Sequence, residues 1–162
     1  MAAMANPLVV EESRPIPVAP QVAFAKMLPM PLPTLFHRRY GPIPPIKAVR
    51  DQTGEWATVG QSRTIALSGG GTMRETLTDV VAPEWFGYSI TGITGPMAPL
   101  IDHVEGEWIF GPHPVGTEVT WRWTIHRKSA LTAPALPVFG KLWRGYARQS
   151  LESLSNYLAG RG

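Results

Sequence analysis

Residues 139–159, FGKLWRGYARQSLESLSNYLA, decide how the chain must fold. Apolar residues recur in this stretch at spacings of three and four, with charged and polar residues between them. At about 100° per residue, this spacing places an apolar arc over about half of a helix. The apolar set is Phe139, Leu142, Trp143, Tyr146, Ala147, Leu151, Leu154, Tyr157 and Leu158. We predict a long amphipathic helix from Gly140 to Leu158 that must lie against a wide apolar surface.

The segments before this helix change to a period of two, which is typical of strands. The clearest case is 117-TEVTWRWTIH-126, in which every second residue is large and apolar. Predicted strands cover 8–18, 46–52, 61–68, 72–80, 84–91, 101–110 and 117–126. Two short helices are predicted at 20–28 and 34–40, each ended by the prolines or glycine that follow. The hairpin connections indicate an antiparallel sheet with one apolar face for the long helix to cover.

Composition narrows the class of protein. A length of 162 residues fits one domain, so we expect a single domain over residues 1–162. The chain lacks cysteine, which excludes disulfides and thiolate metal sites. Its net charge of +3 comes from dispersed basic residues, so we expect no nucleic-acid partner. No apolar run is long enough for a signal core or a membrane span, so we expect a cytoplasmic protein.

Several short motifs accompany this order of elements. They are Arg63, Leu67-Ser68-Gly69-Gly70, Glu75, Leu77, Pro83, Phe86-Gly87-Tyr88, Gly95-Pro96, Gly106-Glu107-Trp108, Gly116-Thr117 and Val119-Thr120-Trp121. Over about residues 8–158 the chain resembles the polyketide cyclase/dehydrase-like proteins of the SRPBCC superfamily, which also holds START domains and plant allergens. The resemblance implies an α+β helix-grip fold: a curved antiparallel sheet of about seven strands around the C-terminal helix, with two short helices after the first strand.

The resemblance also implies a cavity between the sheet and the long helix. Its walls would be Ile65, Leu67, Met73, Leu77, Phe86, Tyr88, Ile90, Trp108, Trp121 and Trp123 from the sheet, and Phe139, Trp143, Tyr146 and Leu151 from the helix. Such walls suit an apolar or flat aromatic ligand that a few polar groups orient. The loops 28–46 and 92–100 would gate the entrance. The alternative is that these side chains fill the interior as an ordinary core.

Arg63 and Glu75 are the two charged residues on otherwise apolar strand faces. If Gly69-Gly70-Gly71 is a three-residue turn, Ser68 pairs with Thr72, and Arg63 lies diagonal to Glu75 and within its reach. Burying either charge alone would cost several kcal/mol, so one hypothesis is a purely structural ion pair. The other is that Arg63 holds a ligand carbonyl or carboxylate, while Glu75 fixes Arg63 or acts as a base.

These observations favour binding of a hydrophobic small molecule, such as a lipid, polyketide or isoprenoid-like compound, with no cofactor and no metal. The resemblance leaves two alternatives open. One is a polyketide aromatase/cyclase in which Arg63 and Tyr88 orient carbonyls with support from Glu75. The other is an interaction or stress-response module with a filled interior. The basic run 37–39 could contact an anionic membrane surface transiently or be a solvated face, and the oligomeric state does not follow from the sequence.

Overall fold

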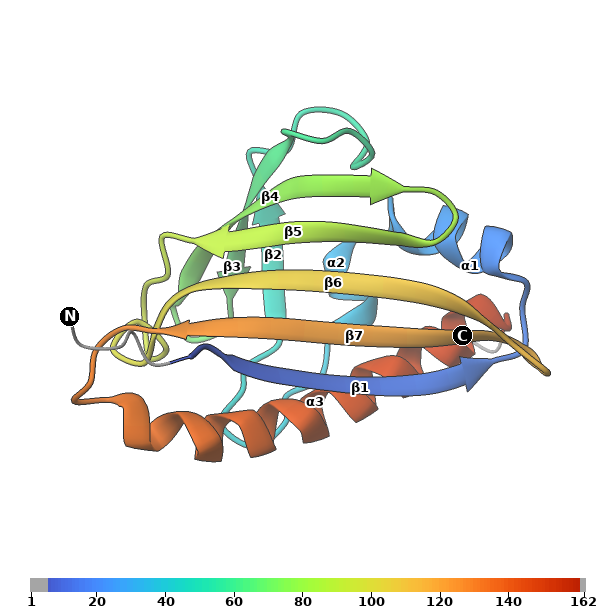
Figure 1. The fold of residues 1–162 in the computed structure, drawn as a ribbon. Helices are drawn as coiled ribbons and strands as arrows, with labels where there is room; N and C mark the ends of the chain where they lie inside the picture. The colour runs from blue at the N-terminus through green and yellow to red at the C-terminus, as the bar shows by residue number, and fades with distance from the viewer. Residues whose placement is uncertain (1–5, 161–162) are drawn as a thin grey trace.

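The computed structural model describes residues 6–160, which form seven strands, three α-helices and one short 3-10 helix (Figure 1). The strands are β1 (Leu8–Ile16), β2 (Ile46–Arg50), β3 (Ser62–Leu67), β4 (Thr72–Val81), β5 (Trp85–Thr91), β6 (Ile101–His113) and β7 (Gly116–Arg127). The helices are α1 (Pro20–Met27), α2 (Leu32–Leu35), the 3-10 turn η1 (Ala133–Ala135) and α3 (Leu136–Leu158).

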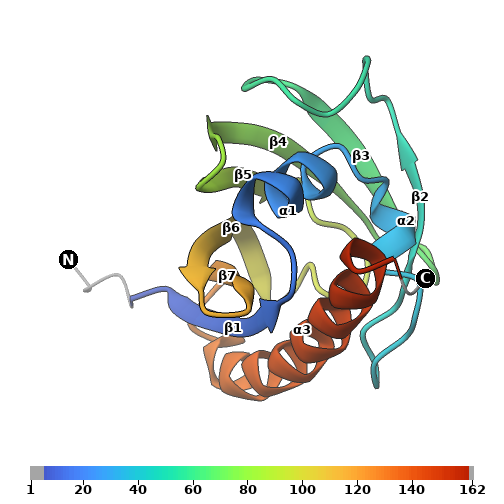
Figure 2. The same cartoon turned by 90° about the vertical axis from the view of Figure 1, so that its right-hand side faces the viewer.

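The strands form one antiparallel sheet in the order β1-β7-β6-β5-β4-β3-β2. The sheet curves, and α3 lies along its concave side, as the end-on view in Figure 2 shows. The short helices lie on the same side: α1 packs against β6 and β7, whereas α2 packs against β2 at the other edge of the sheet (Figure 2). The predicted α+β helix-grip fold is confirmed.

The long helix begins at Leu136, four residues before the predicted start. Pro137 does not prevent this, because the first turn of a helix needs no hydrogen bond from its N–H groups. Trp143, Leu151 and Leu154 on one face are almost completely buried. Gly140 lies so close to β1 that a Cβ there would meet the side chains of Leu8 and Val10.

The second short helix differs from its prediction. It was expected at 34–40 but occupies Leu32–Leu35. Two prolines stand at its start, where they are tolerated, and Phe36 has φ −105° and ψ 51°, which is outside the helical region. The Phe36 carbonyl accepts a hydrogen bond from the Ile46 N–H at 2.8 Å. The chain therefore leaves the helix at Phe36 to join the start of β2.

The β3–β4 hairpin also corrects a prediction. Arg63 lies directly opposite Glu75, not diagonal to it. Gly69 and Gly70 have φ of +98° and +101°, a region that glycine adopts at little cost, whereas Gly71 is not left-handed. Instead the Gly71 carbonyl accepts a hydrogen bond from the Leu67 N–H at 2.8 Å. The turn therefore consists of residues 68–70, and every pair in the hairpin shifts accordingly.

One row of paired residues across the sheet can pack only because its middle residue is a glycine, which has no side chain. Tyr88 on β5, Gly106 on β6 and Trp123 on β7 are paired in register. A Cβ at position 106 would overlap the ring of Tyr88. Glycine at this position therefore lets the Tyr88 ring lie across β6 and reach β7.

We predict that Gly106→Ala lowers the free energy of unfolding by about 1–3 kcal/mol, the usual cost of overpacking a core. Gly111→Ala on the same strand is the matched control, because a Cβ there meets nothing within 4 Å. Urea unfolding of both variants measures the difference. Equal stability of the two variants would contradict the close approach of Tyr88 to Gly106.

Candidate functional site

The space between the sheet and α3 is small and apolar. We call it the inner chamber, and its volume is about 80 Å³. It is lined by Leu32, Phe36, Ile43, Pro44, Ile46, Ile65, Leu67, Met73, Glu75, Tyr88, Ile90, Met97, Trp108, Trp121, Trp123, Phe139, Trp143 and Tyr146. Aromatic rings occupy most of the interior: Trp108 and Trp121 stack with ring centroids 4.9 Å apart, and Trp143 lies 4.8 Å from Trp121.

A larger hollow adjoins the inner chamber. We call it the outer pocket, and its volume is about 480 Å³. It lies between residues 39–44, the β3–β4 turn, residues 94–100 and the start of α3. Five residues line both spaces and form what we call the bottleneck: Ile43, Pro44, Leu67, Met97 and Phe139. The loops expected to gate the cavity therefore supply much of this wall.

The structure brings most of the expected ligand-binding residues to the inner chamber. They are Ile65, Leu67, Met73, Glu75, Tyr88, Trp108, Trp121, Trp123, Phe139, Trp143 and Tyr146. Phe86 lies elsewhere, in a cluster with Phe24 of α1 and Phe110 at ring-centroid distances of 5.8 and 6.1 Å. Arg63 is also absent from the chamber wall.

Sequence reasoning missed the chamber residues that come from loops and short helices. Phe36 is the most prominent, because its ring lies 5.8 Å from Tyr146 and 5.2 Å from Trp121. Ile43 and Met97 were missed for the same reason. Residues in irregular segments have no periodicity that could assign them to a face, and the only available signal was that they are apolar residues among prolines and glycines.

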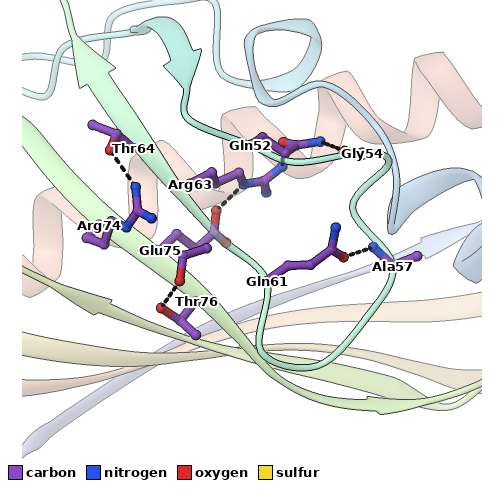
Figure 3. Close-up of polar contacts among 10 residues, drawn as sticks. Gln52, Gly54, Ala57, Gln61, Arg63, Thr64, Arg74, Glu75 and Thr76 are labelled. Atoms are coloured by element: carbon purple, nitrogen blue, oxygen red, sulfur yellow. Dashed lines mark hydrogen bonds and ion pairs between the residues drawn. The ribbon is translucent and has the colours of Figure 1, made fainter.

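The Arg63 guanidinium is surrounded by other side chains of the protein. Its Nε donates to Glu75 Oε1 at 2.6 Å, and its Nη1 donates to Gln52 Oε1 at 3.2 Å (Figure 3). Its Cζ lies 3.9 Å from the ring centroid of Trp56, which is a cation–π contact. Arg63 and Glu75 are 3% and 4% exposed, so the pair has little access to solvent. All three contacts come from side chains of the protein itself, and the guanidinium lies off the chamber wall.

Glu75 differs from Arg63 because it also lines the inner chamber. Burial raises the pKa of Glu75, and the positive charge and hydrogen bond of Arg63 partly oppose that rise. Burial also raises the pKa of Tyr88, and the charge of Glu75 adds to this. The pKa of Tyr146 is raised by burial. Both tyrosine hydroxyls therefore stay protonated at neutral pH.

Hydrogen bonding in the chamber converges on Tyr88. Its hydroxyl oxygen accepts from Trp121 Nε1 at 2.7 Å and from Trp123 Nε1 at 2.9 Å. Trp143 is different, because its buried Nε1 has no partner among the residues that the structure describes. The arrangement is thus an apolar space with a few buried hydrogen-bond donors, which can orient an apolar molecule.

The histidines lie away from this site. His103 and His126 stack at 4.0 Å on the sheet, and each contacts a carboxylate, Asp102 or Glu105, at 2.7 Å. Within residues 6–160, no three or more His, Asp or Glu side chains are grouped so that they could hold a metal ion. None of the helices in that range is long and apolar enough to cross a membrane.

We predict that Arg63→Met lowers the free energy of unfolding by about 3–5 kcal/mol, because it leaves Glu75 buried without a partner, where it must either stay charged or take up a proton. Most of this loss should be recovered in Arg63→Met/Glu75→Leu, which removes both charges. Arg148→Met is the matched control: Arg148 pairs with Glu12 at 3.1 Å but its side chain is 62% exposed, so its loss should cost less than about 1 kcal/mol. Urea unfolding at neutral pH tests all three, and similar losses for Arg63→Met and Arg148→Met would contradict the prediction.

The stability of Arg63→Met should also depend on pH. Without Arg63, burial alone acts on Glu75 and moves its pKa further above the ordinary value of 4.5. In the folded variant Glu75 then keeps a proton that it has released in the unfolded chain. The free energy of unfolding of the variant therefore falls as the pH rises above 4.5, the ordinary pKa of the group. We expect the difference in free energy of unfolding between wild type and Arg63→Met to be smallest in acid and to grow toward neutral pH. Urea midpoints over a pH series measure it, and the double variant should show no such growth.

Comparison with solved structures places the fold among known ones. Ara h 8.0201 matches with a TM-score of 0.67 at 16% identity, over 94% of this chain and 98% of that chain. Major latex-like protein 151 from Panax ginseng matches with a TM-score of 0.70 at 9% identity, over 94% and 98% of the two chains. A protein from Nitrosospira multiformis matches with a TM-score of 0.66 at 17% identity, over 93% and 96%. At these identities the likeness shows the shared fold alone.

The sequence itself identifies the family. Comparison with curated proteins gave no match. A family model described as "Polyketide cyclase / dehydrase and lipid transport" matches residues 7–159, which includes every strand and helix of the structure. The chain therefore belongs to the polyketide cyclase/dehydrase and lipid transport family.

Proposed function

We propose that this protein binds a hydrophobic small molecule at the inner chamber and the outer pocket. The observation that carries the proposal is that the two spaces share the five apolar residues of the bottleneck, so the outer pocket adjoins the interior across an apolar wall. The family description, which includes lipid transport, supports the same function. A lipid, a polyketide or an isoprenoid-like compound would suit these walls.

The two volumes indicate which part of the ligand occupies each space. Pockets for small molecules usually measure about 300–1,000 Å³, and the outer pocket falls within this range while the inner chamber falls below it. We therefore place the body of the ligand in the outer pocket and only one end of it in the chamber. Deeper entry requires the bottleneck side chains to rotate. Met97 is suited to this because its unbranched side chain adapts to different shapes.

The aromatase/cyclase alternative stays a prediction. It assigned Arg63 to orient carbonyls, but this guanidinium is engaged by Glu75, Gln52 and Trp56 and lies outside the chamber wall. Tyr88 and Glu75 do line the chamber. These contacts favour binding over catalysis as the function to test first.

We predict that purified protein yields an apolar compound when extracted with organic solvent, and that the extracted protein binds diphenylhexatriene with a rise in its fluorescence. Phe139→Ala should speed the uptake of this probe severalfold, because it removes the largest side chain of the bottleneck. Val138→Ala is the matched control: Val138 is the adjacent residue, 63% exposed, and lines the outer pocket alone. Stopped-flow fluorescence measures the rates. The absence of both an extracted compound and probe binding would overturn the proposed function.

A further inference from the structure

The position of Tyr88 in the inner chamber makes its hydroxyl group a donor that lacks an acceptor. Because residue 106 is glycine, the Tyr88 ring crosses β6 and its oxygen meets two tryptophans of β7. A phenolic oxygen has two lone pairs and one proton. The indole N–H groups of Trp121 and Trp123 can only donate, and together they occupy both lone pairs. The Tyr88 O–H can therefore only donate, and within residues 6–160 it makes no hydrogen bond to an acceptor, Glu75 included.

A second donor in the same chamber is also without a partner. Trp143 is 1% exposed and lines the chamber, and its Nε1 makes no hydrogen bond within the part of the chain that the structure describes. A buried donor without an acceptor is destabilising, so such a group in a native interior calls for a partner. Two hydrogen-bond donors without acceptors thus lie in one small apolar space.

The charges beside the chamber restrict which acceptor can enter. Glu75 lines the chamber, and its partner Arg63 is already held by Glu75, Gln52 and Trp56. A second carboxylate in this space would meet Glu75, and no cationic side chain lines the described chamber wall, so its burial would be strongly unfavourable. An uncharged oxygen carries no such cost. The chamber volume of about 80 Å³ also admits a small polar group more readily than a whole ring system.

We propose that the ligand enters with an uncharged acceptor oxygen first, of the ketone, quinone or ester carbonyl type, which accepts hydrogen bonds from the Tyr88 hydroxyl and Trp143 Nε1. This inference rests on the proposed function and deepens it. A site of this kind selects neutral carbonyl compounds over free fatty acids and over pure hydrocarbons. The tryptophan pair on β7 acts as a positioning device, because it fixes the Tyr88 oxygen and directs its proton toward the chamber.

Three molecules with one carbon skeleton test the inference: fluorenone, fluorene and fluorene carboxylate. Wild-type protein should bind fluorenone about three- to tenfold more tightly than fluorene, the ratio that one net hydrogen bond supplies. It should bind the carboxylate more weakly than fluorenone at neutral pH. The infrared carbonyl stretch of bound fluorenone should lie below its value in hexane, because a hydrogen bond weakens the carbonyl bond. Calorimetry or fluorescence gives the affinities.

Tyr88→Phe should reduce both the preference for fluorenone over fluorene and the infrared shift, because it removes one of the two donors. Tyr157→Phe is the control, because Tyr157 lies on the outer side of α3 and is 39% exposed. Thermal unfolding by circular dichroism checks that each variant folds. If Tyr88→Phe does not fold, the infrared measurement and the ligand series on wild type still decide the question.

Four outcomes would overturn the inference. Equal binding of fluorenone and fluorene, with the carbonyl stretch at its hexane value, would overturn it and leave the proposed function standing. Binding of the carboxylate as tight as that of fluorenone would do the same. So would loss of the ketone preference in Tyr146→Phe but not in Tyr88→Phe, because the donor would then be the other tyrosine of the chamber. Failure of all three molecules to bind, together with an empty solvent extract, would overturn the proposed function itself.

Discussion

Burial of the apolar face of α3 against the concave side of the sheet is the constraint on which the rest of the structure depends. The sheet must curve to enclose the helix, and irregularities in pairing within β4 and β6 accompany that curvature. Close approach also requires small residues on the helix: Gly140 makes room for β1, and Gly145 makes room for the Tyr40 ring. The large aromatic side chains can then meet in the middle, where they leave only a small space.

The sequence was most informative where a pattern was long. Alternation along β7 and the three-and-four spacing of α3 fixed which faces turn inward, and this identified most of the chamber wall. The β3–β4 turn could not be predicted in the same way, because three successive glycines can each adopt the left-handed conformation. Moving the turn by one residue shifts each pairing by two, and this is why Arg63 faces Glu75 directly. No periodic pattern in the sequence distinguishes a turn at residues 68–70 from one at residues 69–71.

Other parts of the site depend on contacts between distant segments. Phe86 alternates correctly with its neighbours, but α1 brings Phe24 against it, so it packs away from the chamber. Arg63 lies on an inward strand face, yet Gln52 and Trp56 from the β2–β3 connection enclose it. Phe36 and Met97 line the chamber from irregular segments. Local sequence decides the direction of a strand residue, but tertiary contacts decide whether a ligand could reach it.

The pairing of β1 with β7 has a consequence for how the chain acquires its structure. Leu8 pairs with Ile125 and Ile16 with Thr117, so the first strand finds its only sheet neighbour more than a hundred residues later in the described chain. Contacts this distant in sequence close large loops and slow folding, to the order of milliseconds to seconds for β-rich domains. On the ribosome, β1 has no sheet partner until β7 has emerged, and α3 is synthesised later still. The hydrophobic interior can thus form only after β7 and α3 have been synthesised.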